Sequence, residues 1–216
     1  EQACSFDDPA WYTCPCMGFA FGETGSLSLV RTRPGKKDER LQLDRFFSMN
    51  DFAPESSAGG KGILQKWKPL DGDMDNFEKP GFSKELTKRP IVRIMQFGDY
   101  DHDGRATEFL IQTGTLPCGK RMSMAVGVSK QMSRLHVFRS KNNPERPLIL
   151  QAHQWQAIRK SKSGAIKVID WPCGDHGTEK EEELELRASG GAISAVRHQY
   201  ECTDKGRGKY ISGTPF

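Results

Sequence analysis

The chain has 216 residues, a formal net charge of +4, an apolar fraction of 36% and a mean hydropathy of −0.65. This length fits one large domain or two small ones, and the apolar fraction is lean for a globular core of that size. We therefore expect cross-links or bound metal to supplement the core. No apolar run approaches the roughly 18 residues that a membrane-spanning helix needs, which excludes a helical span.

The six cysteines are even in number and spread along the chain, and they contain no C-x-x-C pair of the kind typical of zinc sites. This pattern predicts three disulfides and an oxidising compartment, so we expect an extracellular protein that is secreted, periplasmic or at the cell surface. The alternative is an intracellular binding protein with buried free thiols. The cysteines are Cys4, Cys14, Cys16, Cys118, Cys173 and Cys202.

The first half of the chain carries weak periodicity. Residues 1–25 are rich in Cys, Gly, Pro and aromatic residues, which indicates a Cys-rich loop segment. Residues 26–34 alternate as a strand does, and 53–62 have the composition of a flexible loop. Residues 83–89 predict a short helical turn with Ser83 as its N-cap.

Beyond residue 90 the β signal is stronger. One helix is expected at 150–164, with Trp155 and Ile158 on its buried face, and Gly190 and Gly191 predict a hairpin turn. The chain is thus predicted to be a single domain over 1–216, mainly β, with antiparallel sheets in a sandwich-like or propeller-blade-like arrangement, one or two short helices and stabilising disulfides. Strands are predicted at 90–97, 106–114, 121–128, 134–139 and 165–171.

The stretch "FGDYDHDGRATEFL" at 97–110 places an aspartate at every second position, followed by Gly104. Alternate aspartates on a tight loop can converge on one cation, and Ca²⁺ prefers six to eight oxygen ligands. The spacing therefore predicts a calcium site, in which Arg105 contributes its backbone carbonyl and the acids their carboxylates. The predicted ligands are Asp99, Asp101, Asp103, Arg105 and Glu108.

An EF-hand opens with the same spacing, but the flanks here are strand-like and the twelfth position is Leu110, where an EF-hand keeps a glutamate. Over residues 90–114 the stretch resembles instead the calcium loop of FG-GAP/VCBS-type, integrin-like repeats, in which G-D-x-[DN]-x-D-G lies between two strands. The resemblance implies bound Ca²⁺ in a β-hairpin, used structurally, with His102 facing solvent. That family places its last acid at the ninth loop position, which is Thr107 here, followed by Glu108.

A second acidic cluster, "LDGDMDNF" at 70–77, repeats the spacing with Asp71, Asp73 and Asp75. Asn76 replaces the glycine, and no strand pattern follows. The cluster is either an ordinary polar loop, which we favour, or a second metal site.

The sequence contains no H-E-x-x-H, G-x-S-x-G or Walker pattern, so no recognised catalytic motif is present. In "DWPCGDHGTE" at 170–179, Asp175 and His176 are adjacent, and a carboxylate beside an imidazole can form a general base. The alternative is a disulfide-fastened structural turn at Cys173.

Charge is distributed unevenly. Residues 120–167 carry eleven basic residues and one acid, Glu145, whereas 170–185 carry seven acids and one lysine. Either the two stretches neutralise each other, which we favour, or the basic stretch binds an anionic glycan or another polyanion. The basic residues are Lys120, Arg121, Lys130, Arg134, Arg139, Lys141, Arg146, Arg159, Lys160, Lys162 and Lys167.

Two functions follow from these observations. The first is a secreted or cell-surface β domain, stabilised by calcium and disulfides, with a non-catalytic role in binding, adhesion or assembly. The alternative is an extracellular hydrolase or lyase that acts on a polyanion such as an acidic polysaccharide or a nucleic acid. Edge strands of a mainly β protein can pair between chains, so self-assembly is a further possibility.

Overall fold

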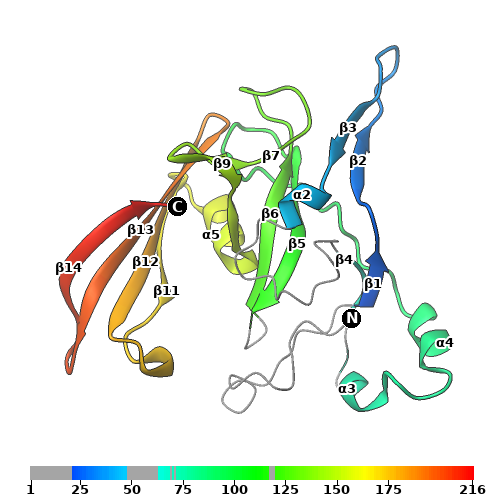
Figure 1. The fold of residues 1–216 in the computed structure, drawn as a ribbon. Coiled ribbons are helices and arrows are strands. Elements are labelled where there is room, and N and C mark those ends of the chain that lie inside the picture. Colours follow the sequence, from blue (N-terminus) through cyan, green and yellow to red (C-terminus); the bar gives the residue numbers. More distant parts are fainter. Residues whose placement is uncertain (1–20, 48–62, 69, 71, 117–119) are drawn as a thin grey trace. The chain divides into compact units, whose positions relative to one another are not determined.

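The computed structural model describes residues 21–47, 63–68, 70, 72–116 and 120–216 (Figure 1). The chain divides into two compact units. Unit 1 comprises Glu1–Gln96 and Phe109–Met124, and unit 2 comprises Phe97–Glu108 and Ala125–Phe216. The single domain expected from the sequence stays a prediction. The flexible loop and most of the Cys-rich segment lie outside the described residues.

The fold is mainly β, as predicted, with antiparallel sheets and short helices. No helix among the described residues has the length and hydrophobicity needed to cross a bilayer. The strands are β1 (Phe21–Thr24), β2 (Ser28–Arg31), β3 (Glu39–Gln42), β4 (Ile63–Trp67), β5 (Glu108–Leu116), β6 (Lys120–Gly127), β7 (His136–Val137), β8 (Arg139–Ser140), β9 (Asn143–Pro147), β10 (Ile149–Gln151), β11 (Ala165–Trp171), β12 (Lys180–Ser189), β13 (Ala192–Thr203) and β14 (Gly206–Pro215). The helices are α2 (Asp44–Phe47), α3 (Asp73–Asn76), α4 (Phe82–Thr87), α5 (Ala152–Lys160) and the 3-10 turn η3 (Asp175–Gly177).

Unit 1 contains two antiparallel pairs, β1 with β4 and β2 with β3. Strand β2 confirms the prediction for 26–34. Helix α4 confirms the predicted turn, but the N-cap is Gly81, at φ 90°, and Ser83 lies inside the helix. The predicted cap is therefore wrong, because glycine adopts the left-handed conformation at the helix entry without steric cost.

The strand predicted at 90–97 is wrong. Residues 91–97 form no strand, although the Val92 amide donates to the Lys66 carbonyl at 2.8 Å. The side chains of Ile91 and Phe97, which are residues typical of strands, are 66% and 55% exposed. β-propensity expresses the fit of a side chain to a half-buried pleated surface, so it produces a strand only where a neighbouring strand supplies that surface.

A four-stranded sheet has the order β10–β6–β5, with β7 also paired to β6, and the boundary between the units passes through β5 and β6. Strands β5 and β6 confirm the predictions for 106–114 and 121–128. The strand predicted at 134–139 is divided between β7 and β8. These belong to different sheets, since β7 pairs with β6 and β8 pairs with β9 and β13.

Unit 2 contains a six-stranded sheet of order β11–β12–β13–β8–β9, with β14 paired to β13. Figure 1 shows β11 to β14, coloured yellow to red, as a curved antiparallel array. The β12–β13 hairpin turns at Gly190 and Gly191, at φ 60° and 94°, which confirms the predicted turn. Strand β11 confirms the prediction for 165–171.

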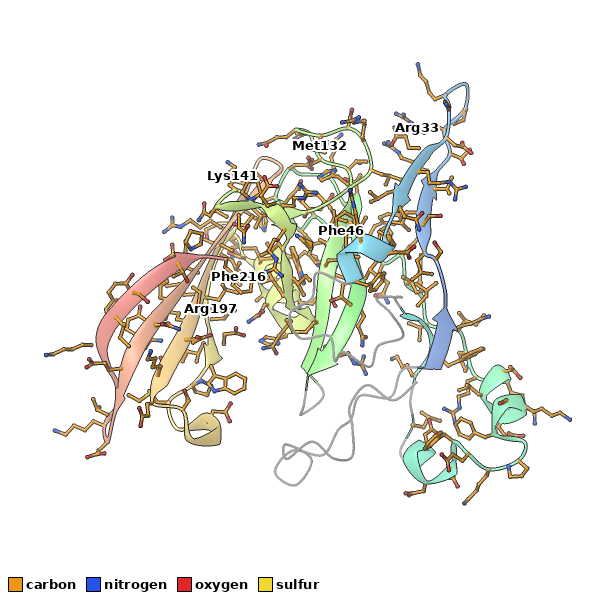
Figure 2. All side chains as sticks on the ribbon, viewed as in Figure 1. Arg33, Phe46, Met132, Lys141, Arg197 and Phe216 are labelled. Atoms are coloured by element: carbon orange, nitrogen blue, oxygen red, sulfur yellow. A yellow bond between two sulfur atoms is a disulfide. The ribbon has the colours of Figure 1, made fainter. Side chains whose placement is uncertain are left out.

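Helix α5 packs against β11 and β12 and covers what we call the inner face of this sheet. Leu184 and Leu186 point to that face and are fully buried. Trp155 and Ile158 of α5 are also 0% exposed, which confirms their predicted place in the core. Near the end of the chain, the guanidinium of Arg197 lies 4.4 Å from the centroid of the Phe216 ring (Figure 2).

A disulfide joins Cys173, in the β11–β12 connection, to Cys202 of β13, with the two Cα atoms 5.5 Å apart. The two cysteines are 29 residues apart in the sequence, and the disulfide links the β11–β12 connection to the end of β13. One cross-link of the predicted set is thus present. The other four cysteines lie outside the described residues.

The acids of β12 are neutralised largely within the sheet. Arg207 of β14 pairs with Glu181 and, at 2.9 Å, with Glu183, while Lys167 of β11 lies 3.2 Å from Glu185. Lys167 thus provides one contact of the mutual neutralisation expected between the basic and the acidic stretch, whereas Arg207 lies outside the basic stretch. The other basic side chains that the structure describes in the basic stretch are exposed, namely Arg121, Lys130, Arg134, Arg139, Lys141, Arg146, Arg159, Lys160 and Lys162.

The ion pairs of Glu185 should make the stability of the fold depend on pH in the acidic range. Hydrogen bonds from Arg187 and Lys167 lower the pKa of Glu185 to about 2, against the opposing effect of burial, and His198 lies 3.3 Å away. A carboxyl with a depressed folded pKa stabilises the fold above its unfolded pKa and loses that contribution as the pH falls toward 2. We expect Glu185→Gln to lose about 2 kcal/mol at pH 6 and about 0.5 kcal/mol at pH 2.5, because the folded-state carboxyl is protonated only as the pH falls through about 2. Equal losses at both pH values, measured by urea unfolding, would contradict this.

Candidate metal centre

The acidic loop closes on itself within unit 2. The Gly98 amide donates to the Glu108 carbonyl at 2.8 Å, and the Glu108 amide donates to the Gly98 carbonyl at 3.3 Å. Residues 99–107 thus form a loop that connects the paired residues Gly98 and Glu108. The side chain of Glu108 lies near Asp99 and Asp101. Gly104, at φ 86°, adopts the left-handed conformation that allows the loop to turn sharply after the aspartates.

Three of the predicted ligands come together at the centre of this loop. Asp99, Asp101 and Glu108 each offer a carboxylate oxygen within 4.8 Å of the other two. Oxygens bound to one Ca²⁺ at about 2.3–2.6 Å lie at most about 5 Å apart, so this spacing fits a single ion. Asp101 and Glu108 are fully buried, and Asp99 is half-buried. The cluster can therefore hold a metal ion.

Asp101 carries the most unusual atom of the cluster. Its Oδ1 accepts a hydrogen bond from the Asp103 amide at 3.1 Å, but its buried Oδ2 has no hydrogen-bond partner. Burial, together with the negative charges of Glu108 and Asp103, raises the pKa of Asp101 to about 7. A buried carboxylate oxygen without a partner costs free energy. A bound cation would give this oxygen a partner and would offset the repulsion between Asp101 and the neighbouring carboxylates.

Glu108 is held by the loop backbone and by Thr107. Its Oε2 accepts from the Tyr100 amide at 2.8 Å, and burial raises its pKa. The Thr107 hydroxyl lies 2.7 Å from Glu108 Oε1 and 2.8 Å from the Val128 carbonyl oxygen. A hydroxyl has one proton and donates to only one of these acceptors. When the Thr107 hydroxyl donates to the Val128 carbonyl, its oxygen faces Glu108 Oε1 without a proton between them, and the two oxygens can then share a cation.

Asp103 lies outside the cluster. Its Oδ1 accepts from the Arg105 amide at 2.8 Å, and its Oδ2 accepts from the Lys130 amide at 2.7 Å and the Arg105 side chain at 3.0 Å. Burial acts to raise the pKa of Asp103, but these hydrogen bonds and the charge of Arg105 lower it overall. Its negative charge is already balanced by Arg105, and the carbonyl of Arg105 accepts from the Thr107 amide.

The loop is also hydrogen-bonded to the β12–β13 turn and to the end of α5. The carbonyls of Asp101 and His102 accept from the amides of Gly191 and Gly190 in the β12–β13 turn, at 3.2 and 3.1 Å. His102 Nε2 donates to the Ile158 carbonyl at the end of α5, at 2.7 Å. The expectation that His102 faces solvent is therefore wrong, because its left-handed backbone, at φ 53°, turns the ring toward α5.

Tyr100 anchors the loop to the core. It is 1% exposed, its ring packs edge-on against Trp155 with centroids 5.9 Å apart, and its hydroxyl accepts from the Gln156 side chain at 3.1 Å. Sequence reasoning missed this residue. The available signal was that an aromatic residue lies between two aspartates of the alternating series. If the alternating aspartates point toward the centre of the loop, the residue between them points away from it, toward the core.

The second acidic cluster behaves as an ordinary polar segment where the structure describes it. Asp73 begins α3, and its carboxylate accepts from both guanidinium nitrogens of Arg89, at 2.7 and 2.8 Å. This hydrogen bonding with Arg89 lowers the pKa of Asp73 despite burial. Asp75 is exposed, and Asp71 lies outside the described residues.

The two candidate catalytic residues lie in η3, between the disulfide-bonded Cys173 and the start of β12. The backbone of this turn is described, but the side chain of His176 is not. A general base formed by Asp175 and His176 therefore stays a prediction.

The fold and the site together define a mainly β protein with a buried carboxylate cluster in a tight loop. Comparisons with protein-family models, with curated proteins and with solved structures give no match.

Proposed function

We propose that the chain is an extracellular, non-catalytic binding domain in which Ca²⁺ occupies the cluster of Asp99, Asp101 and Glu108. The observation that carries the cation is the buried Oδ2 of Asp101, which lacks a hydrogen-bond partner among carboxylates that repel one another. Ca²⁺ suits this donor set because it is a hard cation and tolerates irregular oxygen shells. The integrin-like spacing of the loop supports the same ion.

The residues available as ligands are three carboxylates and the Thr107 hydroxyl, with water completing the shell. The backbone carbonyl of Arg105 remains a predicted ligand. Mg²⁺ demands a near-ideal octahedron at 2.0–2.1 Å, which a rigid, hydrogen-bonded loop provides less readily. We therefore expect Ca²⁺ to bind more tightly than Mg²⁺.

A structural role for the ion follows from where the loop is attached. The same loop holds the end of α5, the β12–β13 turn and the backbone at Lys130. Asp101 and Glu108 are 0% exposed, so a macromolecular substrate cannot reach them. The ion would therefore stabilise unit 2 and leave ligand binding to exposed surfaces. The disulfide between Cys173 and Cys202 favours an oxidising, extracellular compartment. Calcium sites of extracellular modules with a Kd as weak as about 10⁻³ M are occupied there.

Thermal melting tests the proposed function. The protein is stripped with a chelator, dialysed, and melted with added Ca²⁺, with Mg²⁺ or with neither, while calorimetry gives the stoichiometry. We expect one Ca²⁺ per chain and a stabilisation of about 2.7 kcal/mol when the free ion is a hundred times its Kd. No bound ion and no shift of the melting temperature at 5 mM Ca²⁺ would overturn the cation site.

The non-catalytic part of the proposal has a separate test. The calcium-loaded protein is incubated with acidic polysaccharides and nucleic acids, and the products are analysed by size. Intact polymers agree with a binding role. Cleavage that His176→Ala abolishes would instead assign the chain to the hydrolases or lyases that act on polyanions.

A further inference from the structure

The outer face of the β11–β14 sheet, opposite α5, carries a compact group of polar and aromatic side chains. The strand register pairs Glu183 with His198, and His198 with Gly213. It also pairs Tyr200 with Tyr210, and because Tyr200 and His198 are two residues apart, all of these positions share one face. An irregularity between Gln199 and Tyr200 keeps Tyr210 and Gly213 on the same side.

The Tyr210 side chain extends along this face as far as Gly213. A Cβ placed on Gly213 would be 2.6 Å from the Tyr210 hydroxyl oxygen and 3.2 Å from His198 Nδ1. The tyrosine side chain therefore runs over the bare backbone of Gly213 and does not stand upright on the sheet. Tyr210 remains 56% exposed, so its ring offers an aromatic surface to solvent.

Neighbouring rings fix this orientation. The Tyr200 ring meets Tyr210 in an edge-on contact with centroids 5.6 Å apart, and the His198 ring is tilted against it at 6.0 Å. The guanidinium carbon of Arg207 lies 4.3 Å from the centroid of the Tyr200 ring. An exposed ring held on two sides loses little conformational freedom when a ligand stacks on it.

Hydrogen-bonding groups contact the two rings that pack against Tyr210, namely His198 and Tyr200, and the charges of these groups cancel. His198 Nε2 lies 3.3 Å from Glu185, whose carboxylate also contacts Lys167 and Arg187. Glu183 accepts from Arg207 and lies 3.4 Å from the Tyr200 hydroxyl. Each acid is balanced by a neighbouring base, so the patch attracts neither a polyanion nor a polycation.

We propose that this outer-face patch, centred on Tyr210, binds a neutral oligosaccharide. A pyranose ring has an apolar C–H face that stacks on an exposed aromatic ring, and hydroxyls at its rim that bond to carboxylates, imidazoles and ammonium groups. The patch offers both features, with Tyr210 as the stacking surface and Glu185, His198 and Lys167 at the rim. The inference rests on the proposed binding role, and it is independent of the cation site.

The test uses the full, calcium-loaded chain and affinity electrophoresis in gels that contain neutral glucans, mannans, xylans or galactans, with acidic polysaccharides alongside. We expect retardation in at least one neutral glycan. Tyr210→Ala should weaken this binding at least tenfold, and Tyr210→Phe should retain it because the ring remains. Gly213→Ala should also weaken it, since the added methyl displaces the ring.

Ser212→Ala is the matched control, because Ser212 is on the same strand but pairs with Gln199 on the opposite face. It should bind as the wild type does. Binding that is unchanged in Tyr210→Ala, or retardation confined to acidic polysaccharides, would overturn the proposal, and the second outcome would transfer binding to the basic stretch. Melting temperatures with and without Ca²⁺ show whether each variant is folded, and they keep a failure of this inference distinct from a failure of the cation site.

Discussion

Asp101→Asn should be at least as stable as the wild type without calcium, and calcium should no longer raise its melting temperature. In the ion-free loop the Asp101 carboxylate is buried, has one oxygen without a partner and faces the charges of Asp99 and Glu108. Replacement by an amide of the same shape removes the repulsion, whereas it deletes a charged ligand from the cation site. The substitution therefore separates two properties that a general folding defect would change together.

The comparison requires melts of both proteins in chelator and in 5 mM Ca²⁺. For the wild type we expect a stabilisation by calcium of about 2.7 kcal/mol or more once the ion exceeds its Kd a hundredfold. Asp103→Asn is the control, because the Asp103 carboxylate holds Arg105 and Lys130, and its loss should destabilise the protein under both conditions. A calcium response retained in full by Asp101→Asn would remove this residue from the site.

Trp155→Ala should destabilise the protein by about 3–5 kcal/mol, the largest effect that we expect from a single core substitution. Trp155 is 0% exposed on α5, at the interface with the β11–β12 face of the sheet. Removal of the indole leaves a cavity that the surrounding strands cannot fully close, because strand pairing holds their backbone in place. Urea unfolding monitored by far-UV circular dichroism measures the loss.

The same substitution should weaken calcium binding. Tyr100 rests edge-on against Trp155, and its amide donates to Glu108 Oε2, so a loss of the indole loosens one of the ligands. Trp155→Phe keeps an aromatic ring against Tyr100 and should lose less stability and less affinity. A loss below 1 kcal/mol in Trp155→Ala, or an unchanged calcium Kd at a temperature where the variant is folded, would contradict this coupling.

The sequence predicted the parts of this protein that depend on local periodicity. Alternation over residues 165–171 specified strand β11, and the adjacent glycines at 190 and 191 specified the turn of the β12–β13 hairpin. The spacing of Trp155 and Ile158 specified the buried side of a short helix. Each of these signals lies within a few residues, where the geometry of the backbone alone decides which side chains share a face.

For the candidate site, the D-x-D-x-D-G spacing was sufficient to locate an acidic loop that bends at Gly104 and to include Asp99, Asp101 and Glu108, whose carboxylates come together there, among the candidate ligands. It could not distinguish Asp103 from the other aspartates. Asp103 differs from the other aspartates because its Oδ2 accepts a hydrogen bond from the amide of Lys130, which is 27 residues away in the sequence.

Local pattern thus determined where the carboxylates are, the hairpin and helix that surround them, and the mainly β class of the chain. The tertiary structure alone decided that residues 91–97 form no strand, that His102 turns toward α5, and that one oxygen of Asp101 is buried without a partner. The reason is physical: strand pairing, burial and hydrogen-bond satisfaction depend on groups that the fold brings from distant parts of the chain.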